Sequence, residues 1–406
     1  MSAKLPPFDA ADPLGIDDLL EPEDLAVRDT VRGWAADRVL PYIADWYEKG
    51  ELPRIRELAR ELGGIGALGM SLTGYGCAGA SAVQYGLACL ELEAADSGIR
   101  SLVSVQGSLA MYAIHRFGSE EQKREWLPRM AAGEVIGCFG LTEPDHGSDP
   151  ASMRTHARKD GGGTSRSSGA ESGGDWVLNG RKMWITNGSV AGVAVVWAQT
   201  EEGVRGFVVP TDTPGFSAPE IKHKWSLRAS VTSELVLDDV RLPASAVLPQ
   251  VVGLRGPLSC LSHARYGIVW GAMGAARSSF ESAVQYAKTR EQFGRPIGGF
   301  QLTQAKLADM AVELHKGILL AHHLGRRMDA GRLRPEQVSF GKLNNVREAI
   351  EICRTARTIL GANGISLEYP VMRHATNLES VLTYEGTVEM HQLVLGKALT
   401  GLDAFR

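Results

Sequence analysis

The sequence changes character at residues 138–149, which read CFGLTEPDHGSD. Before this stretch, from Glu21 to about Met130, apolar residues recur at the spacing of an amphipathic helix. After it come short runs rich in β-branched and aromatic residues, such as 193–197 and 207–209, separated by turn residues. From Gly256 onward the helical spacing returns. This order predicts an α+β multidomain chain with an α-helical N-terminal domain (1–137), a β-sheet or barrel middle domain (138–250) and a C-terminal helical bundle (251–406).

Composition narrows the classes of function. The chain has 406 residues and a formal net charge of −4, so it is long enough for several packed regions and has no global basic field for nucleic acid. No apolar run approaches the roughly 20 residues that span a bilayer, and the opening residues lack a signal or transit pattern. Five cysteines lie far apart without a Cys-x-x-Cys pair. We therefore expect a cytoplasmic protein that binds no membrane, nucleic acid or metal.

One dinucleotide-binding fingerprint occurs at residues 64–69, GIGALG. It follows a helical run at 56–62, whereas the fingerprint needs a preceding strand to bring pyrophosphate to the next helix. We interpret it as a glycine-rich helix exit and not as a nicotinamide site.

An acid, Glu385, lies where the helical pattern breaks, in the run TYEGT at 383–387. A lone Glu is most often a solvated surface charge. In a dry pocket it would instead be a base with a pKa raised toward neutrality. Gly386 fits the second interpretation, because a residue without a side chain lets a substrate carbonyl approach backbone N–H groups.

Four motifs together resemble the acyl-CoA dehydrogenases, a family of flavoenzymes. They are the turn at 141–149, MWITN at 183–187, REQFG at 290–294 and TYEGT at 383–387, and the resemblance runs from about Glu23 to Phe405. It implies the family fold, with a C-terminal four-helix bundle, and FAD as cofactor. It also implies that Glu385 removes the α-proton of an acyl-CoA while the β-hydrogen leaves as hydride to the flavin. Hydrogen bonds from the Glu385 amide and a flavin ribityl hydroxyl would stabilise the enolate.

The resemblance also assigns cofactor contacts. Without it, the 139–148 segment would be an ordinary connection, Trp184 a core aromatic residue and Arg290 a cation at a helix end. With it, Arg290, Gln301 and the segment 358–362 contact an FAD bound mainly by another subunit, which implies an oligomer. The implied flavin contacts are Phe139, Leu141, Thr142, Gly147, Ser148, Trp184, Ile185, Thr186, Arg290, Phe293, Gln301, Thr358, Leu360, Gly361, Thr387 and Phe405.

Within the family the sequence is closest to the glutaryl-CoA dehydrogenases, through ELEAADSGIRS at 91–101. In that subfamily the pair matching Arg100 and Ser101 meets the distal carboxylate of glutaryl-CoA. Burying a carboxylate is costly unless a cation and a hydroxyl meet it. The alternative is a surface Arg100 paired with Asp96 at i,i+4, worth about 0.3–0.5 kcal/mol. The implied substrate contacts are Arg100, Ser101, Glu93, Ser148, Arg265, Tyr384 and Gly386, of which Glu93 and Tyr384 favour the decarboxylating variant.

The prediction is therefore an FAD-dependent glutaryl-CoA dehydrogenase that yields crotonyl-CoA and CO2, forms a homotetramer and passes electrons to an electron-transfer flavoprotein. Three alternatives remain: a dehydrogenase for another short acyl-CoA or without decarboxylation, an oxidase that uses O2, and a flavin-binding protein without activity. Three departures from the family are visible. Asp145 and His146 replace a more usual Asn-Ser, and residues 388–390, VEM, alter the positions after Thr387. Residues 160–174 form a longer, Gly- and Ser-rich segment that we expect to be a flexible surface loop.

Overall fold

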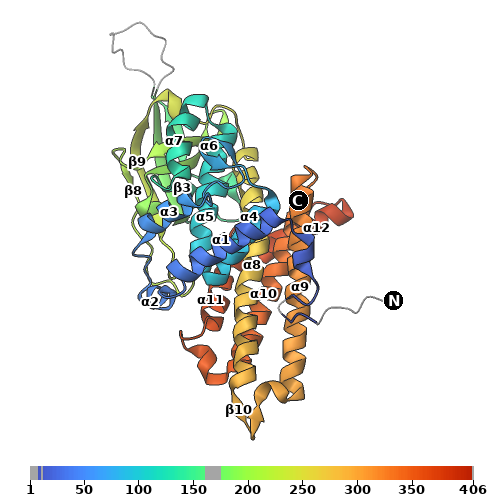
Figure 1. Cartoon of the computed structure of the whole chain (residues 1–406). Helices are drawn as coiled ribbons and strands as arrows, with labels where there is room; N and C mark the ends of the chain where they lie inside the picture. Colours follow the sequence, from blue (N-terminus) through green and yellow to red (C-terminus); the bar gives the residue numbers. More distant parts are fainter. Residues whose placement is uncertain (1–7, 11, 161–174, 405–406) are drawn as a thin grey trace.

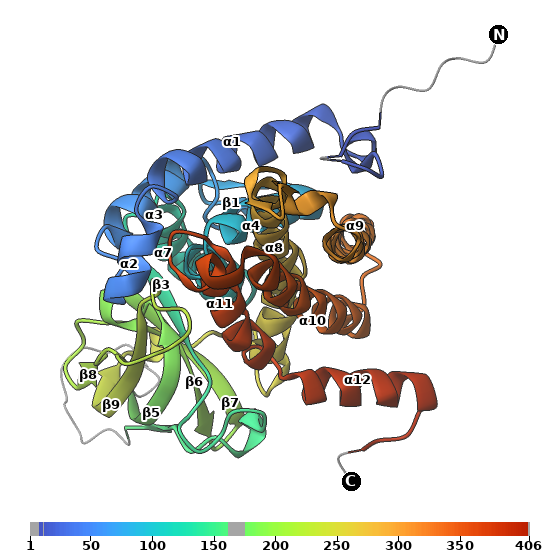
Figure 2. The ribbon, with the colours of Figure 1, turned by 90° about the horizontal axis from the view of Figure 1, so that it is seen from below.

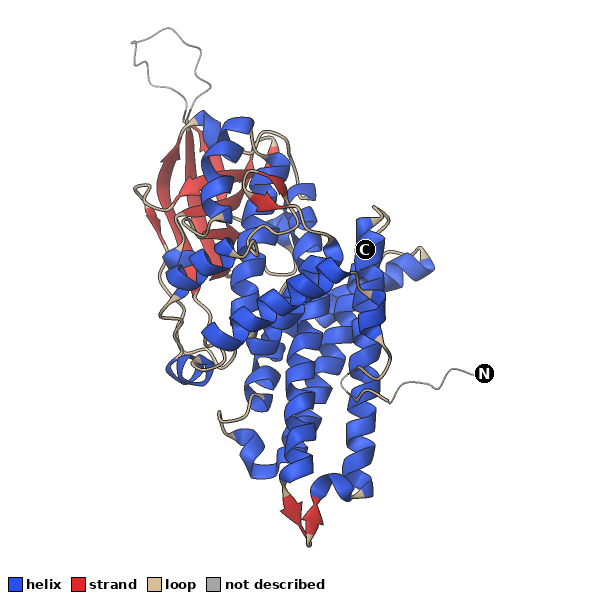
Figure 3. Ribbon diagram, viewed as in Figure 1, coloured by secondary structure: helices blue, strands red, loops and turns tan. Residues whose placement is uncertain are grey.

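The computed structural model describes residues 8–10, 12–160 and 175–404, and it separates helical from sheet regions (Figure 3). The first region is helical. Ser119 caps the start of its last helix, because the Ser119 hydroxyl accepts from Gln122 N and the Gln122 amide oxygen accepts from Ser119 N. The helices are α1 (Pro22–Arg38), α2 (Ile43–Lys49), α3 (Ile55–Gly64), α4 (Ala82–Ala95), α5 (Ser97–Ser104), α6 (Tyr112–Phe117) and α7 (Glu120–Ala131), with a π-helical turn at Val105–Met111, a 3-10 turn at Ile16–Leu19 and the hairpin strands β1 (Thr73–Gly74) and β2 (Cys77–Ala78).

The glycines of the GIGALG run lie at the end of a helix. Gly64 is the last residue of α3, and Gly66 and Gly69 follow with φ of 74° and 66°. A helix, not a strand, precedes the run. The geometry of a dinucleotide-binding turn is therefore missing, as predicted.

The middle region is a seven-stranded mixed sheet with the order β3-β6-β4-β5-β9-β8, in which β7 also pairs with β6. β3 pairs with β6 in parallel, whereas β5 pairs with β9 and β6 with β7 in antiparallel fashion. The predicted runs 193–197 and 207–209 lie inside β6 and β7. The strands are β3 (Gly137–Gly140), β4 (His156–Lys159), β5 (Trp176–Thr186), β6 (Val193–Thr200), β7 (Gly203–Pro210), β8 (Phe216–Ser217) and β9 (Thr232–Leu242).

The third region is the helical bundle, seen nearly end-on in Figure 2. Its four long helices are α8 (Arg255–Thr289), α9 (Gln301–Asp329), α10 (Pro335–Leu360) and α11 (Val371–Thr383). A fifth helix, α12 (Val388–Thr400), packs on α10 and extends away from the bundle. A short hairpin of β10 (Glu291–Gln292) and β11 (Arg295–Pro296) joins α8 to α9 at the end remote from the sheet (Figure 1).

The bundle and the N-terminal helices share a core, because α4 lies directly against α8. Glycines on α8 allow this close approach: a Cβ on Gly274 would lie 1.9 Å from Leu90 O, and one on Gly271 would lie 2.0 Å from Glu93 Oε2. The predicted order of helical, sheet and helical regions is confirmed. Residues 161–174 of the predicted flexible loop lie outside the described residues.

The part of the chain that the structure describes contains no group of three or more His, Cys, Asp or Glu side chains that could hold a metal ion. Within the same residues, no helix is both long and apolar enough to cross a bilayer. All five cysteines are free thiols, and four of them are buried.

Candidate active site

The segment that carries Glu385 joins two helices. α11 ends at Thr383, and the backbone then turns through Glu385 and Gly386, with φ of 53° and 103°. The Thr387 hydroxyl caps α12 by accepting from Met390 N at 3.3 Å. The helix break that the sequence predicts is therefore a sharp left-handed turn between two helix ends.

Glu385 is not a solvated surface charge. Its Oε2 is buried and has no hydrogen-bond partner among the described residues. Burial raises the pKa of Glu385, and the nearby cations Arg100, Lys342 and Arg265 oppose this rise. A carboxylate in such a setting is chemically suited to accept a proton.

Arg100 lies on α5 with 1% of its surface exposed. Its Nε donates to Glu93 Oε2 at 2.6 Å, and its Nη2 donates to the Tyr384 hydroxyl. The alternative pairing with Asp96 is wrong, because Asp96 Oδ2 accepts from Arg373 Nη1 at 2.6 Å instead. The structure thus brings Arg100, Glu93 and Tyr384 together beside Glu385.

Several polar atoms around Arg100 have no partner of ordinary geometry. Glu93 Oε1 and the Ser101 hydroxyl are buried without a hydrogen bond among the described residues, although Ser101 lies beside the Tyr384 hydroxyl. Buried polar groups are nearly always paired, so these atoms are candidates for contacts with ordered water or with a bound molecule. Together with Glu385 Oε2 they outline a polar binding site.

Arg265 lies on α8, and its Nε donates to the carbonyl oxygen of Glu385 at 2.5 Å. It is partly buried, so it is not an exposed helix cation. Its neighbour Tyr266 is fully buried and donates its hydroxyl to Ala82 O at 2.7 Å, so Tyr266 is a core residue.

Lys342 is a buried residue of this site that the sequence reasoning missed. It lies on α10 with 2% of its surface exposed, and its Nζ donates to Gly386 O at 2.6 Å and to Tyr384 O. Burial lowers the pKa of Lys342 to about 7. The available signal was a lysine at helical spacing from Val338 and Val346, which is a weak one.

Two of the predicted flavin segments lie side by side. Met183 N donates to Thr142 O at 2.8 Å, which joins the turn after β3 to the end of β5. Trp184 is 61% exposed with φ of 63°, at a register shift of β5 against β9, so its interpretation as a core aromatic residue is wrong. Around it, Phe139, Leu141 and Ile185 are buried, Thr186 is partly buried, and Gly147 and Ser148 are exposed.

A buried ion pair beneath this turn was also missed. Lys182 Nζ donates to Glu143 Oε1 at 2.8 Å and to Leu141 O at 3.1 Å, and Glu143 also accepts from the backbone of Arg154 and Thr155. Burial opposes the charge of Glu143, but the hydrogen bond from Lys182 leads the contacts that lower its pKa to about 2. This pair fixes the turn on the sheet, and nothing in the spacing of residues 143 and 182 predicts it.

The remaining predicted cofactor residues do not join this site within one chain. Arg290 and Phe293 lie at the hairpin between α8 and α9, and Gln301 begins α9, all at the end of the bundle remote from β3 and β5 (Figure 1). Phe293 is 94% exposed and Thr358 is exposed, whereas Leu360 is buried and Gly361 ends α10 with φ of 61°. Phe405 lies outside the described residues.

Comparison with known proteins agrees with this arrangement. Residues 21–134, 138–240 and 252–400 match the N-terminal, middle and C-terminal domains of acyl-CoA dehydrogenase. The human "Short-chain specific acyl-CoA dehydrogenase, mitochondrial" is 33% identical over 90% of this chain and 87% of its own length. A crystal structure of glutaryl-CoA dehydrogenase from Mycobacterium smegmatis is 70% identical with a TM-score of 0.93, covering 98% of this chain and 99% of that one. A second glutaryl-CoA dehydrogenase from that organism, in complex with FADH2, is 63% identical with a TM-score of 0.92, covering 97% and 98%. The chain belongs to the acyl-CoA dehydrogenase family.

Proposed function

We propose that this enzyme is an FAD-dependent glutaryl-CoA dehydrogenase in which Glu385 is the α-proton base. The observation that carries the proposal is Arg100, a buried guanidinium within the same polar site as Glu385. A pocket for a plain fatty-acyl chain would have apolar residues at this place. The identity of 70% to a glutaryl-CoA dehydrogenase, against 33% to a short-chain enzyme, supports the same substrate.

The charges of the site leave room for one more carboxylate. Three cations, Arg100, Arg265 and Lys342, surround two acids, Glu93 and Glu385. When all five are ionised, one positive charge is in excess in a buried region, which is costly. The distal carboxylate of glutaryl-CoA would balance this charge, and the unpaired Ser101 hydroxyl would donate to it. Glu93 keeps Arg100 in place when no substrate is bound.

The residues around Trp184 fit a flavin. Trp184 offers an exposed aromatic face beside Thr142 and Thr186, whose hydroxyls suit ring carbonyls and nitrogens. Phe139, Leu141 and Ile185 of the same two segments are buried. We assign FAD contacts to these residues, to Gly147, Ser148 and Thr387, and, from a second subunit, to Arg290, Phe293, Gln301, Thr358, Leu360 and Gly361. Electrons pass to an electron-transfer flavoprotein, and the enzyme is a cytoplasmic homotetramer.

The chain's own residues would act as follows. The Glu385 carboxylate would take the proton from Cα. FAD, when bound, would supply the acceptor for the hydride that leaves Cβ with its electron pair, so that a Cα=Cβ double bond forms. Arg100 and Ser101 hold the distal carboxylate, and this contact fixes Cα near Glu385. For decarboxylation, the bond from Cγ to the carboxylate breaks, CO2 leaves, and Cγ takes a proton to give crotonyl-CoA. Glu385, protonated by the first step, is the nearest acid in the proposed site.

Anaerobic titration of the flavin-loaded enzyme with glutaryl-CoA and with butyryl-CoA tests this proposal. We expect the wild type to reduce fastest with glutaryl-CoA and to release CO2. Glu385→Gln should lower the rate of flavin bleaching by about 10³-fold or more while acyl-CoA still binds, because an amide cannot accept the proton.

Arg100→Ala should lower kcat/KM for glutaryl-CoA by about 100-fold and leave butyryl-CoA within a few fold. Equal wild-type activity on both substrates would overturn the glutaryl assignment. A dehydrogenation without CO2 would replace it by the non-decarboxylating enzyme. Peroxide release in air would indicate an oxidase, and a flavin that no acyl-CoA bleaches would indicate a non-catalytic protein.

A further inference from the structure

The base segment has an unfavourable backbone conformation. Glu385 is a non-glycine residue with φ of 53°, and Gly386 follows with φ of 103°. For an L-residue the left-handed region is unfavourable by about 1–2 kcal/mol, and such residues persist only where neighbouring groups hold them. The Glu385 carboxylate must be oriented toward one C–H bond of the substrate to act as the base. Because this turn sets its orientation, neighbouring groups have to keep the turn in place.

Lys342 supplies contacts on both sides of Glu385. Its Nζ donates to the carbonyl oxygens of Tyr384 and Gly386, the residues immediately before and after the base. The carbonyl between them, that of Glu385, accepts from Arg265 Nε. Three consecutive carbonyl groups are thus bound by two cations that come from α10 and α8. Lys342 alone spans the turn, since it binds the two outer carbonyls at one atom.

A buried lysine in this position lowers the stability of the fold. Its hydrogen bonds go to carbonyl oxygens and not to a carboxylate, although it is 2% exposed. Burial lowers the pKa of Lys342, the charge of Glu385 opposes this effect, and Arg265 and Arg100 add to it. The other titratable groups that face it are Tyr384, whose ring centre lies 5.8 Å from Nζ, and His391 of α12. An uncharged residue would be more stable here if the lysine had only to fill space.

We propose that Lys342 is a positioning residue for the α-proton base: its ammonium fastens the carbonyl groups on either side of Glu385 and so holds the carboxylate toward the substrate. This inference rests on the proposed role of Glu385 but not on the identity of the acyl group. Lys342 touches neither the substrate nor the reacting atoms in this role. It acts through the backbone of the turn and through its charge.

The test compares Lys342→Met with the wild type and with Lys316→Met, a control at a lysine of α9 whose side chain is 60% exposed and pairs with Glu313. Flavin-loaded protein is mixed anaerobically with saturating glutaryl-CoA or butyryl-CoA, and the first-order loss of oxidised-flavin absorbance is followed across pH 6–9. Binding of crotonyl-CoA is measured by the flavin spectral change, and Tm is recorded.

For Lys342→Met we expect a reduction rate constant about 100-fold lower with both acyl-CoAs, and crotonyl-CoA binding within about threefold. The acid limb of the rate should move to higher pH, because one of the cations facing Glu385 is gone. Lys316→Met should match the wild type. If Lys342→Met loses its flavin, Lys342→Gln, which keeps one donor amide, should fold and show the same pH shift with at least about a tenfold loss.

A flavin-loaded Lys342 variant that reduces within twofold of the wild type, with an unmoved acid limb, would overturn the proposal. The proposal would also be overturned by a variant that changes Tm or crotonyl-CoA binding but not the reduction rate at saturation, because these results would indicate that Lys342 only stabilises the fold. The wild-type preference between glutaryl-CoA and butyryl-CoA is a separate readout. A wild type that prefers butyryl-CoA refutes the glutaryl assignment, while an equal loss on both substrates in Lys342→Met still supports the positioning role.

Discussion

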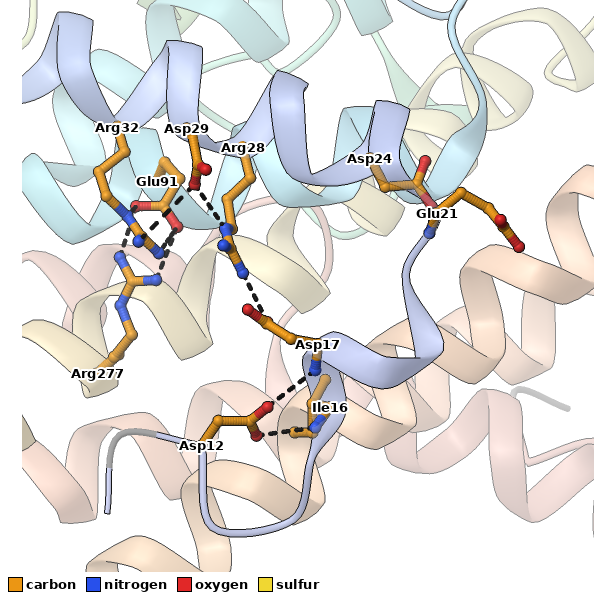
Figure 4. A network of polar contacts seen from close by, with 10 residues as sticks. All are labelled: Asp12, Ile16, Asp17, Glu21, Asp24, Arg28, Asp29, Arg32, Glu91 and Arg277. Atoms are coloured by element: carbon orange, nitrogen blue, oxygen red, sulfur yellow. Dashed lines mark hydrogen bonds and ion pairs between the residues drawn. The ribbon is translucent and has the colours of Figure 1, made fainter. Parts of the chain in front are cut away.

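Glu91 and Glu93 lie two residues apart on α4 and both are buried, but they meet different partners. Residues at i and i+2 of a helix do not share a face. Glu91 accepts from Arg277 at 2.6 and 2.7 Å and from Arg32 at 3.0 and 3.1 Å, so both of its oxygens are bound (Figure 4). Glu93 binds only Arg100, and its Oε1 has no partner among the described residues.

This difference distinguishes Glu91, whose oxygens are all bound within the fold, from Glu93, which in the proposed function lies at the substrate site. The site of Glu91 is a closed network that joins α1, α4 and α8 and continues through Arg28 to Asp17, near the start of the described chain (Figure 4). Both oxygens of Glu91 are bound, and the one network atom that is buried without a hydrogen bond among the described residues, Arg277 Nε, lies 3.6 Å from Glu281 Oε1. The site of Glu93 has an unpaired oxygen, Glu93 Oε1, among the described residues, and its cations outnumber its acids. The completeness of pairing, not burial, distinguishes the two acids.

The largest effect on kcat/KM should come from Gly271→Ala, which displaces the Glu93 site and leaves the Glu91 network in place. The added Cβ would lie 2.0 Å from Glu93 Oε2 and 3.3 Å from Arg100 Nε, so the ion pair must move. Overpacking of this kind costs about 1–3 kcal/mol, and we expect kcat/KM for glutaryl-CoA to fall about tenfold to 100-fold. Steady-state kinetics with both acyl-CoAs measures this.

A matched control is Gly33→Ala on α1, next to Arg32 of the Glu91 network. An added Cβ there meets nothing within 4 Å. In a helix interior this change should stabilise the protein by about 0.5–1 kcal/mol and leave kcat/KM unchanged. If Gly271→Ala is equally harmless, the Glu93–Arg100 pair does not bind the substrate.

Glu91→Gln should show the opposite pattern. It removes charge-assisted hydrogen bonds from a closed network, so we expect a loss of about 2 kcal/mol of stability with kcat/KM within twofold of the wild type. Urea unfolding of flavin-loaded protein at one fixed concentration measures the first quantity. If Glu91→Gln instead lost much of its activity without losing stability, Glu91 would belong to the active site, and the distinction between Glu91 and Glu93 would be wrong.

The smallest effect is the pH dependence of the contribution that Glu91 makes to the free energy of unfolding. Burial disfavours the charge of Glu91, but the hydrogen bonds from Arg277 and then Arg32 outweigh it, so its folded pKa is lowered. A lowered folded pKa means that the stabilisation is complete above the unfolded value of about 4.3 and is lost as pH falls through the folded pKa. The stability gap between wild type and Glu91→Gln should therefore narrow in acid. A gap that widens as pH falls would contradict this sign.

Much of the proposed site could be predicted because its residues lie in contiguous sequence motifs. The break at Glu385, the pair Arg100 and Ser101, and the turn at 139–148 could each be identified without the fold, and the structure brings the first two together. What residues alone could not predict was exposure. Trp184 has the sequence context of a core strand, but the register shift of β5 turns it outward. Arg100 and Asp96 have ideal helical spacing, yet each binds a partner from elsewhere.

By itself, the sequence determined the order of helical and sheet regions, because the spacing of apolar residues acts within a few residues. Only the tertiary structure decided which charges meet. Lys342 lies on α10 and Glu385 follows the end of α11, while Glu143 and Lys182 lie on either side of β4, so their proximity follows from how these helices and strands pack. The roles of Glu91 and Glu93 diverge for the same reason: one turn of α4 presents two acids to different neighbours, and a partner's position is a property of the fold.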